Sequence, residues 1–381
     1  MVGKIFFLSL TIITSLSAQS QPWTLTSAPN TNWQAVACST DGTKIVAAAW
    51  NSSSPIGGAI YRSTDSGTTW TSSGSPEAPW QALACSGDMT KIIAPTFSGA
   101  IYVSTNSGAT WFPTASNYLW GAAACSPNGN LFLAVSFGPA GIFASTNSGS
   151  VWMPLATPSQ PWQSIASSAD GTYLVAGVAY GAIYTSSNSG AIWTSNNVPH
   201  AYWQSVVSST DGSNLAGAAE FSGPICISSD TGTTWSASNA PPGNWQSIAS
   251  SSDGSKLVAV AQNGPIYTST DSGTTWIPDK APGKSWISVA SSSDGNQRVA
   301  AAFGGGIYIS RMAPLLRICL SPSTVILSWP STSPGFALQE NSGLIGINWV
   351  TLTNKPTITN GQNRVTIPVS GAKKFYRLYS E

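Results

Sequence analysis

The sequence predicts an all-β chain whose main part is a seven-bladed β-propeller, and three observations carry that prediction. An eight-residue segment ending in tryptophan recurs six times at an almost constant period. A second segment, which begins with tryptophan, alternates with the first and occurs seven times. Apolar runs and tight-turn dipeptides lie between them, so that each unit contains four short strands. Units of four strands at a period of roughly 20–50 residues are typical of a propeller.

The N-terminal 20 residues differ in composition from the repeats. Lys4 precedes an apolar run from Ile5 to Leu16, and small residues follow as far as Ser20. This is the layout of a secretory signal peptide, and the run is too short for a stable membrane anchor. We therefore assign residues 1–20 to a signal peptide. The mature protein is expected to be secreted, periplasmic or on the cell surface, with no membrane span.

The first repeated segment, called the box below, is STDSGTTW at Ser63–Trp70. Its closing tryptophans are spaced by 41, 41, 41, 42 and 41 residues. Three of the six boxes carry asparagine (Asn106, Asn147 and Asn188) in place of aspartate. Asparagine keeps an acceptor oxygen but loses the charge that a calcium site or a general acid requires. The box is therefore interpreted as a turn whose tryptophan packs between blades, and no metal site is predicted.

The second repeated segment, of the form WQ-x-x-A, supplies the first strand of each unit. It begins at Trp33, Trp80, Trp120, Trp162, Trp203, Trp245 and Trp286. An Asp-Gly or Asn-Gly dipeptide follows in most copies and predicts a tight hairpin to a second, apolar strand. The third strand is of the form Ala100–Tyr102, and the Thr-Trp that ends the box is taken as the fourth.

The two ends of the repeat region complement each other. The seventh unit has a third strand at Gly306–Ser310 but no box after it. At the other end of the region, Trp23–Thr26 precedes the first unit in the same way as a box tryptophan precedes the unit that follows it. The N-terminal strand is therefore predicted to complete the last blade. Such closure leaves no unpaired sheet edge.

The pattern S-x-D-x-G-x-T-W, over residues 21–311, resembles the Asp-box or bacterial neuraminidase repeat. Sialidases, some glucan hydrolases, sortilin-type receptors and propellers of the photosystem II assembly factor type carry this repeat. The resemblance implies that the boxes lie on the rear face and that ligands bind the opposite, front face. A sialidase would need an arginine triad on the front, but Arg62, Arg298 and Arg311 are all predicted near the rear. Sialidase activity is therefore not expected.

Aromatic residues recur on the predicted front face. The position 17 residues after each unit's first tryptophan is Trp50, Phe97, Phe137, Ala179, Glu220, Gln262 or Phe303, and Tyr180 follows Ala179. Aromatic faces with scattered polar groups suit sugar rings or apolar peptide side chains, although packing between blades is equally compatible with the sequence. The candidate ligand-binding residues are Trp50, Phe97, Phe137, Tyr180, Tyr202, Glu220 and Phe303.

Few acidic residues of the propeller lie outside boxes and turns: Glu77, Glu220 and Asp279. A glycosidase needs two carboxyl groups about 5–10 Å apart. Glu220 and Asp279 are the one pair that the sequence offers, and each alone is interpreted as a solvated loop acid. Without Lys4 the chain has 14 basic and 14 acidic residues, which is unlike a nucleic-acid binder. The five cysteines are interpreted as buried free thiols, and no cofactor is predicted.

Residues 312–381 lack the repeat. Strands are predicted at Val325–Trp329, Phe336–Glu340, Trp349–Leu352, Arg364–Val369 and Phe375–Tyr379. The segment resembles the small β-sandwich modules that end many secreted bacterial proteins, and attachment, sorting or spacing is its expected role.

The sequence thus predicts an exported, non-enzymatic, monomeric propeller that binds a glycan or a protein ligand on its front face. Two alternatives stay open. One is an Asp-box glycoside hydrolase that uses Glu220 or Asp279, and the other is an assembly factor for an exported protein complex.

Overall fold

The structure is a computed structural model. It describes residues 22–50, 57–114, 118–137, 140–312, 316–321, 323–330, 336–342, 348–369 and 374–380. The predicted signal peptide, residues 1–20, lies outside the described residues. Contacts divide the described chain into two compact units, one of which is Pro22–Arg311, while the other contains Met312–Glu381. Each unit is described by itself.

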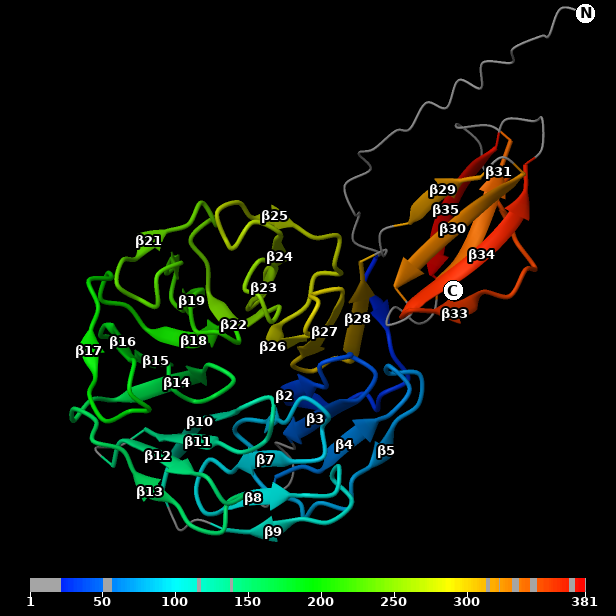
Figure 1. Ribbon diagram of the computed structural model, residues 1–381. Helices are drawn as coiled ribbons and strands as arrows, with labels where there is room; N and C mark the ends of the chain where they lie inside the picture. Colours follow the sequence, from blue (N-terminus) through cyan, green and yellow to red (C-terminus); the bar gives the residue numbers. More distant parts are fainter. Residues whose placement is uncertain are drawn as a thin grey trace, which may run out of the picture. The chain divides into compact units, whose positions relative to one another are not determined.

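The first unit is all-β, and its sheets are arranged in a ring (Figure 1). Its described residues form seven antiparallel sheets of four strands each. The first three are β2 (Asn32–Cys38), β3 (Ile45–Trp50), β4 (Ile60–Ser63) and β5 (Thr71–Ser72); β6 (Ala84–Cys85), β7 (Ile92–Pro95), β8 (Ile101–Ser104) and β9 (Phe112–Pro113); and β10 (Trp120–Cys125), β11 (Phe132–Ser136), β12 (Ile142–Ser145) and β13 (Met153–Pro154).

The next three sheets repeat this order. They are β14 (Trp162–Ser167), β15 (Leu174–Val178), β16 (Ile183–Ser186) and β17 (Thr194–Ser195); β18 (Trp203–Ser208), β19 (Leu215–Ala219), β20 (Ile225–Ser228) and β21 (Ser236–Ala237); and β22 (Trp245–Ser250), β23 (Leu257–Ala261), β24 (Ile266–Ser269) and β25 (Ile277–Pro278).

The last sheet combines both ends of the unit. It contains β26 (Trp286–Ser291), β27 (Gln297–Ala302), β28 (Ile307–Arg311) and the N-terminal β1 (Thr24–Leu25). Strand β1 pairs antiparallel with β28, with Thr24 opposite Ile309. The N-terminal segment therefore supplies the strand that the seventh repeat lacks.

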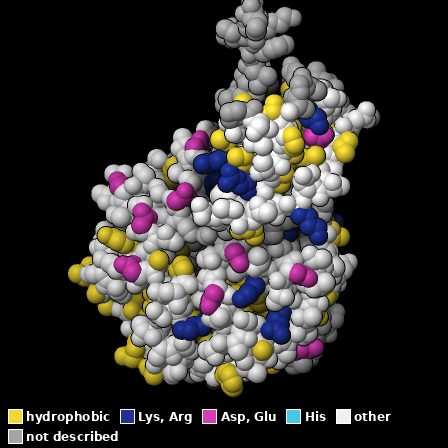
Figure 2. Space-filling view, turned by 45° about the vertical axis from the view of Figure 1, so that its right-hand side comes forward, with side chains coloured by type: hydrophobic (Ala, Val, Ile, Leu, Met, Phe, Trp, Pro, Cys, Tyr) yellow, Lys and Arg dark blue, Asp and Glu magenta, His cyan; other side chains and the backbone are white. Residues whose placement is uncertain are grey.

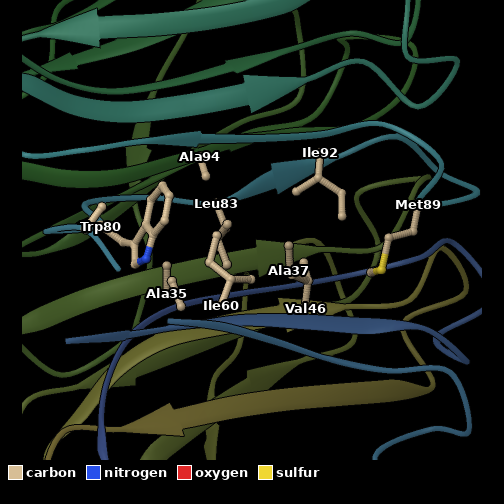
Figure 3. Close-up of a cluster of buried hydrophobic side chains, with 11 residues drawn as sticks. Ala35, Ala37, Val46, Ile60, Trp80, Leu83, Met89, Ile92 and Ala94 are labelled. Carbon is tan, nitrogen blue, oxygen red and sulfur yellow. The ribbon is translucent and has the colours of Figure 1, made fainter. Parts of the chain in front are cut away.

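The hydrophobic core lies between neighbouring sheets. In the cluster of Figure 3, Ala35 and Val46 of the first sheet pack with Trp80 and Ile92 of the second. An equivalent cluster joins the first sheet to the last, and it includes Trp33. Because each sheet is covered on both faces, its strands are apolar on both sides and rich in small residues, without strict alternation.

The repeated tryptophan at or near the start of each first strand is central to these clusters. All seven are at most 1% exposed. The indole of Trp33 meets the side chain of Tyr61, on the third strand of the same sheet, edge to face at 5.7 Å, and Trp162 meets Tyr184 in the same way at 5.1 Å. Burial of a large apolar side chain contributes about 1.5–3 kcal/mol, so the repeated tryptophans are a main source of stability.

The box is a turn held by its acidic or amide side chain. Asp65 Oδ1 accepts hydrogen bonds from Ser63 Oγ at 2.8 Å and from the Thr69 amide at 2.8 Å. Asn106 Oδ1 accepts the equivalent bonds at 3.0 and 2.9 Å in the second box. The same two bonds therefore form with or without the charge, which is the acceptor role that the asparagine copies predicted.

The turns between first and second strands are hydrogen-bonded to one another around the ring. The backbone amide of Thr40 donates to the Gly87 carbonyl, and the circle closes where the Ser293 amide donates to the Thr40 carbonyl. The seven residues at this position are Thr40, Gly87, Pro127, Ala169, Thr210, Ser252 and Ser293, and six bonds of 2.7–2.8 Å join them. The missing link is at Pro127, because proline has no amide proton.

The fourth strands differ from the prediction. They follow the box tryptophan instead of containing it, as in Thr71–Ser72 after Trp70. The indole of Trp70 instead donates a hydrogen bond to the carbonyl of Gly67 at 3.1 Å. The tryptophan is thus fixed within the turn, and the outer strand starts one residue later.

The second unit contains two sheets. The sheets are β29 (Arg317–Leu320), β30 (Thr324–Pro330), β34 (Gln362–Pro368) and β33 (Thr357–Thr359), and β32 (Val350–Thr351), β31 (Phe336–Asn341) and β35 (Phe375–Ser380). Leu327 and Val365 of the first sheet share a buried cluster with Leu338 and Leu378 of the second. Strands β29 and β33 were not predicted, because both are short and exposed and therefore show no burial pattern.

The five cysteines are free. Burial raises the pKa of the Cys85 thiol to about 12, so the group stays protonated at neutral pH. The prediction of buried thiols is wrong for Cys319, which is exposed. It lies on the short outer strand β29.

Candidate functional site

A cavity of about 250 Å³ lies at the centre of the first unit. Each of the seven sheets contributes three consecutive residues, the ones directly after its first tryptophan. These described lining residues are 34–36, 81–83, 121–123, 163–165, 204–206, 246–248 and 287–289. The cavity is therefore formed by the front parts of the innermost segments of the seven repeats, and it is called the central cavity below.

Glutamine recurs at the first of these three lining positions. Five sheets carry it, as Gln34, Gln81, Gln163, Gln204 and Gln246. In β14 the register slips between Trp162 and Ser164, so that Gln163 is the extra residue of a β-bulge, and the slip recurs in five further first strands. A bulge redirects a side chain out of the regular ladder. The WQ dipeptides of the sequence were the signal for this amide-lined cavity, but no role was predicted for them.

Three of these glutamines are hydrogen-bonded to described side chains. Gln163 Nε2 donates to Gln204 Oε1 at 2.7 Å, and Tyr202 Oη donates to Gln163 Oε1 at 3.0 Å. Gln246 Nε2 donates to Glu220 Oε1 at 2.8 Å. These bonds connect the central cavity with two of the residues predicted for ligand binding.

Two further predicted residues lie near Gly121, the lining residue of the third sheet. Phe137 packs directly over Gly121, so closely that a Cβ atom at residue 121 would come within 2.8 Å of its ring. Phe97, which is 44% exposed, lies 6.2 Å from Phe137 between ring centroids. Glycine replaces glutamine in this sheet because the phenyl ring occupies the space of a side chain.

Tyr180, Tyr202 and Phe221 form a group of three contacting side chains, called the aromatic cluster below. Tyr202 stands edge to face against Tyr180 at 5.1 Å and against Phe221 at 5.4 Å. Tyr180 and Phe221 are parallel, with centroids 6.3 Å apart. They are 72% and 59% exposed, so the cluster presents aromatic surface to solvent. Phe221 was not among the predicted ligand-binding residues, yet it is as central to the cluster as Tyr180.

The backbone at the two exposed members of the cluster is strained. Tyr180 and Phe221 have φ of 56° and 57°, in the left-handed region. The equivalent positions of the next two sheets hold Asn263 and Gly304, at φ of 54° and 65°. Asparagine and glycine accept this conformation easily, whereas a bulky aromatic residue there costs about 1–3 kcal/mol. The turn itself therefore does not require the aromatic side chains.

Burial and the carboxylate of Glu220 determine the electrostatic environment of the aromatic cluster. Glu220 is half-buried beside Phe221. Burial, followed by the negative charge of Glu220 and the proximity of Tyr180, raises the pKa of Tyr202. Tyr202 is therefore a neutral hydroxyl donor over the ordinary pH range. On the face that Figure 2 presents, acidic and basic side chains lie among largely uncharged surface.

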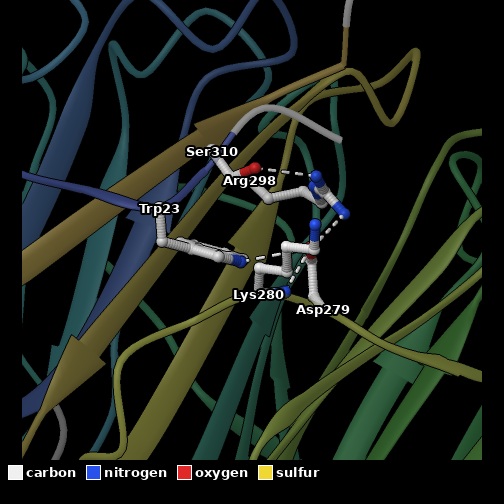
Figure 4. Close-up of polar contacts among 5 residues, drawn as sticks. All are labelled: Trp23, Asp279, Lys280, Arg298 and Ser310. Carbon is white, nitrogen blue, oxygen red and sulfur yellow. Dashed lines mark hydrogen bonds and ion pairs between the residues drawn. The ribbon is translucent and has the colours of Figure 1, made fainter. Parts of the chain in front are cut away.

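Asp279 has a different environment from the one expected. Its carboxylate lies 3.1 Å from Arg298 and accepts a 3.2 Å hydrogen bond from Trp23 (Figure 4), and both charged side chains are at most 4% exposed. The interpretation of Asp279 as a solvated loop acid is therefore wrong. Burial against Arg298 explains why the side chain does not reach solvent.

The remaining candidates are more dispersed. Trp50 is half-buried at the end of β3, and Phe303 is 46% exposed after β27. The described residues place neither of them in contact with the aromatic cluster. Within the described parts of the chain, no group of three or more His, Cys, Asp or Glu is placed to hold a metal ion, and no helix there could cross a membrane.

Comparisons with known proteins give the fold. No family model matches the chain, and no curated protein matches it. Among solved structures, YCF48 from Cyanidioschyzon merolae is 13% identical with a TM-score of 0.59, over 76% of this chain and 98% of that one. A structure of YCF48 bound to D1 peptide is 13% identical with a TM-score of 0.58, over 79% of this chain and 99% of that one.

A glycoside hydrolase is also similar. The GH74 xyloglucanase from Xanthomonas campestris is 14% identical with a TM-score of 0.59, over 82% of this chain and 59% of that one. This chain therefore spans about three-fifths of the length of that enzyme. Similarity at these identities shows the architecture alone, and the first unit accordingly has a β-propeller fold.

Proposed function

We propose that this chain is an exported binding protein: a seven-bladed propeller over residues 21–311 that recognises a glycan or a protein partner on the face opposite the boxes. In this proposal residues 1–20 are a signal peptide and residues 312–381 are a β-sandwich module for attachment or spacing. The repeats at Ser63–Trp70 and its equivalents are Asp-boxes that fasten the blades. The chain acts as a monomer.

The observation that carries this proposal is the strained aromatic cluster. Tyr180 and Phe221 hold left-handed turn positions at which Asn263 and Gly304 serve in neighbouring sheets. Backbone strain of this kind persists at binding and catalytic sites, where the side chain is needed for another purpose than folding. Exposed aromatic faces beside a carboxylate and amides supply stacking and hydrogen bonds to one ligand.

The similar structures support a binding role for either class of partner. The YCF48 structure holds a D1 peptide, which favours a protein partner and the assembly-factor variant of the proposal. The other similar structure is a xyloglucanase, which favours a glycan ligand. Hydrolysis by this chain has less support, because Asp279 is engaged by Arg298 and Trp23 and Glu220 accepts a hydrogen bond from Gln246.

The experiment combines a glycan array with affinity capture, using the mature protein and the variant Tyr180→Asn/Phe221→Asn. Asparagine fits the left-handed turn, so the variant is expected to fold with a higher midpoint temperature and to lose its ligand. Phe112→Ala is the matched control, because Phe112 is 58% exposed on the outer strand β9 and far along the sheet from the front. The control should bind as the unchanged protein does.

Equal binding by the unchanged protein and by Tyr180→Asn/Phe221→Asn would overturn the proposed site. Turnover of a glycan substrate that disappears in Glu220→Gln would instead establish the hydrolase alternative. If the protein captures one defined exported complex and binds no glycan, the assembly-factor variant of the proposal is the correct one.

A further inference from the structure

The described lining of the central cavity lies in the front part of the propeller. The lining residues are the three that directly follow the first tryptophan of each repeat, for example Gln34, Ala35 and Val36 after Trp33. The strands continue toward the rear and end at the turns, where the circle of backbone hydrogen bonds from Thr40 to Ser293 joins neighbouring sheets. A ligand therefore enters from the front, where the aromatic cluster lies.

The lining has a defined chemistry. All twenty-one described lining residues are uncharged, and glutamine and serine supply their polar side-chain groups. Each glutamine amide can both donate and accept hydrogen bonds. A charged ligand would lose its hydration in such a cavity without gaining a countercharge. The lining therefore suits a neutral ligand that is rich in groups which donate and accept, as hydroxyls do.

The glutamines differ in their availability. Gln163 is hydrogen-bonded to Gln204 and to Tyr202, and Gln246 is hydrogen-bonded to Glu220. Among the described residues, no side-chain hydrogen bond is found for Gln34 or Gln81, the adjacent pair contributed by the first two sheets. These two amides can bind a ligand without breaking a bond that the protein already makes.

The size and the rim restrict the ligand further. A volume of about 250 Å³ equals the liquid volume of about eight water molecules, and it lies below the roughly 300–1,000 Å³ of pockets for drug-sized molecules. Phe137, packed over Gly121, adds an aromatic face at the edge of the cavity. One ring that carries hydroxyls around an apolar face fits these dimensions.

From these observations we infer that the central cavity is a subsite for one neutral sugar residue, bound by Gln34 and Gln81 and stacked at its rim by Phe137. This inference rests on the proposed function and selects the glycan from its two ligand classes. The end of a peptide chain fits less well, because its ammonium or carboxylate group would find no countercharge among the described lining residues.

The test uses small ligands that need the cavity alone. Neutral methyl pyranosides, the corresponding uronic acids and a peptide blocked at both ends are titrated into the mature protein, and binding is followed by saturation-transfer NMR. The neutral glycosides should bind at millimolar concentration. Gln34→Ala/Gln81→Ala should weaken this binding by about tenfold, since two hydrogen bonds are lost. Gln262→Ala, an exposed glutamine outside the lining, is the matched control and should not change it.

Three results would overturn the inference. The first is equal glycoside binding by the unchanged protein and the folded Gln34→Ala/Gln81→Ala variant. The second is binding of the uronic acids or of the blocked peptide in preference to the neutral glycosides, and the third is no glycoside binding. A filled variant, Gln34→Trp, supplies a second measurement and should abolish glycoside binding while the aromatic cluster stays intact.

The test of the sugar subsite can fail or succeed independently of the test of the proposed function. If Tyr180→Asn/Phe221→Asn keeps the macromolecular partner while Gln34→Ala/Gln81→Ala loses the glycoside, the front aromatic site fails and the subsite stands. If Tyr180→Asn/Phe221→Asn instead loses the macromolecular partner while Gln34→Ala/Gln81→Ala keeps the glycoside, the subsite is wrong and the proposed function stands.

Discussion

Trp23 and Asp279 are 256 residues apart in the chain, yet Trp23 Nε1 donates a 3.2 Å hydrogen bond to Asp279 Oδ2. Trp23 also lies 6.3 Å from Trp286, between ring centroids, and beneath the guanidinium of Arg298. The N-terminal segment is thus fastened to the last two sheets by packing and by a polar contact, in addition to the pairing of β1 with β28.

Replacing Trp23 by alanine should open this closure. The Trp23→Ala variant loses a buried aromatic side chain, and we expect the free energy of unfolding to fall by about 3–5 kcal/mol. Denaturant unfolding measures the change. Leu25→Ala is the control from the same strand, because Leu25 is 62% exposed, and it should change stability by less than about 0.5 kcal/mol. Equal effects of the two variants would show that Trp23 does not fasten the propeller.

The ion pair between Arg298 and Asp279 should behave as a unit. Asp279→Ala leaves the guanidinium of Arg298 buried without its partner, and a loss of about 3–5 kcal/mol of stability is expected. Replacing both residues, as Asp279→Leu/Arg298→Met, should recover most of that loss. Additive losses in the double-mutant cycle would contradict a paired contact.

The boxes should tolerate asparagine but not alanine. Asp271 Oδ1 accepts a hydrogen bond from the Thr275 amide at 2.8 Å, as Asn106 Oδ1 does from Thr110. We expect Asp271→Asn to leave the midpoint temperature nearly unchanged and Asp271→Ala to cost about 1 kcal/mol. Thermal unfolding of the two variants tests this expectation. Equal losses would mean that the charge matters in this turn.

The turns between first and second strands should make stability depend on pH in acid. Hydrogen bonds, with that from Ser86 first, lower the pKa of Asp88 to about 2, and those led by Ser168 lower the pKa of Asp170 to about 2. The folded-state pKa lies below the ordinary value of about 3.9. The carboxylates therefore stabilise the fold above about pH 4, and their contribution is lost as the pH falls toward 2.

Asparagine already occupies this turn in the third sheet, where Asn128 Oδ1 accepts a hydrogen bond from Ser126 Oγ at 2.7 Å. Asp170→Asn should accordingly show a shallower loss of stability between about pH 4 and 2. Urea unfolding at a series of pH values measures it. An acid profile identical to that of the unchanged protein would contradict the assignment.

Much of the fold could be predicted from the sequence because the repeat shows where each unit begins. The seven copies of the segment that begins with tryptophan give the number of units, and the match between Trp23–Thr26 and the incomplete last unit indicated how the ends pair. The two-residue outer strands and the short strands of the second unit could not be placed. They bury little and carry no periodic pattern.

The candidate site was predicted less completely. Tyr180, Tyr202 and Glu220 were selected from their position on the front, but the geometry that joins Tyr180 to Phe221 depends on a left-handed residue one step beyond the counted position. The burial of Asp279 depends on Arg298 and on Trp23, which are distant in the sequence. The amide-lined cavity arises because seven distant segments meet at one axis.

The central claim is that ligands bind at the front, beside the aromatic cluster. Hydrogen exchange of the mature protein, with and without its captured ligand, tests this claim most directly. Protection is predicted at residues 179–181, 201–204 and 220–223, while the boxes, for example 63–70, exchange as before. Protection confined to the boxes, with unchanged exchange around Tyr180 and Phe221, would contradict the claim.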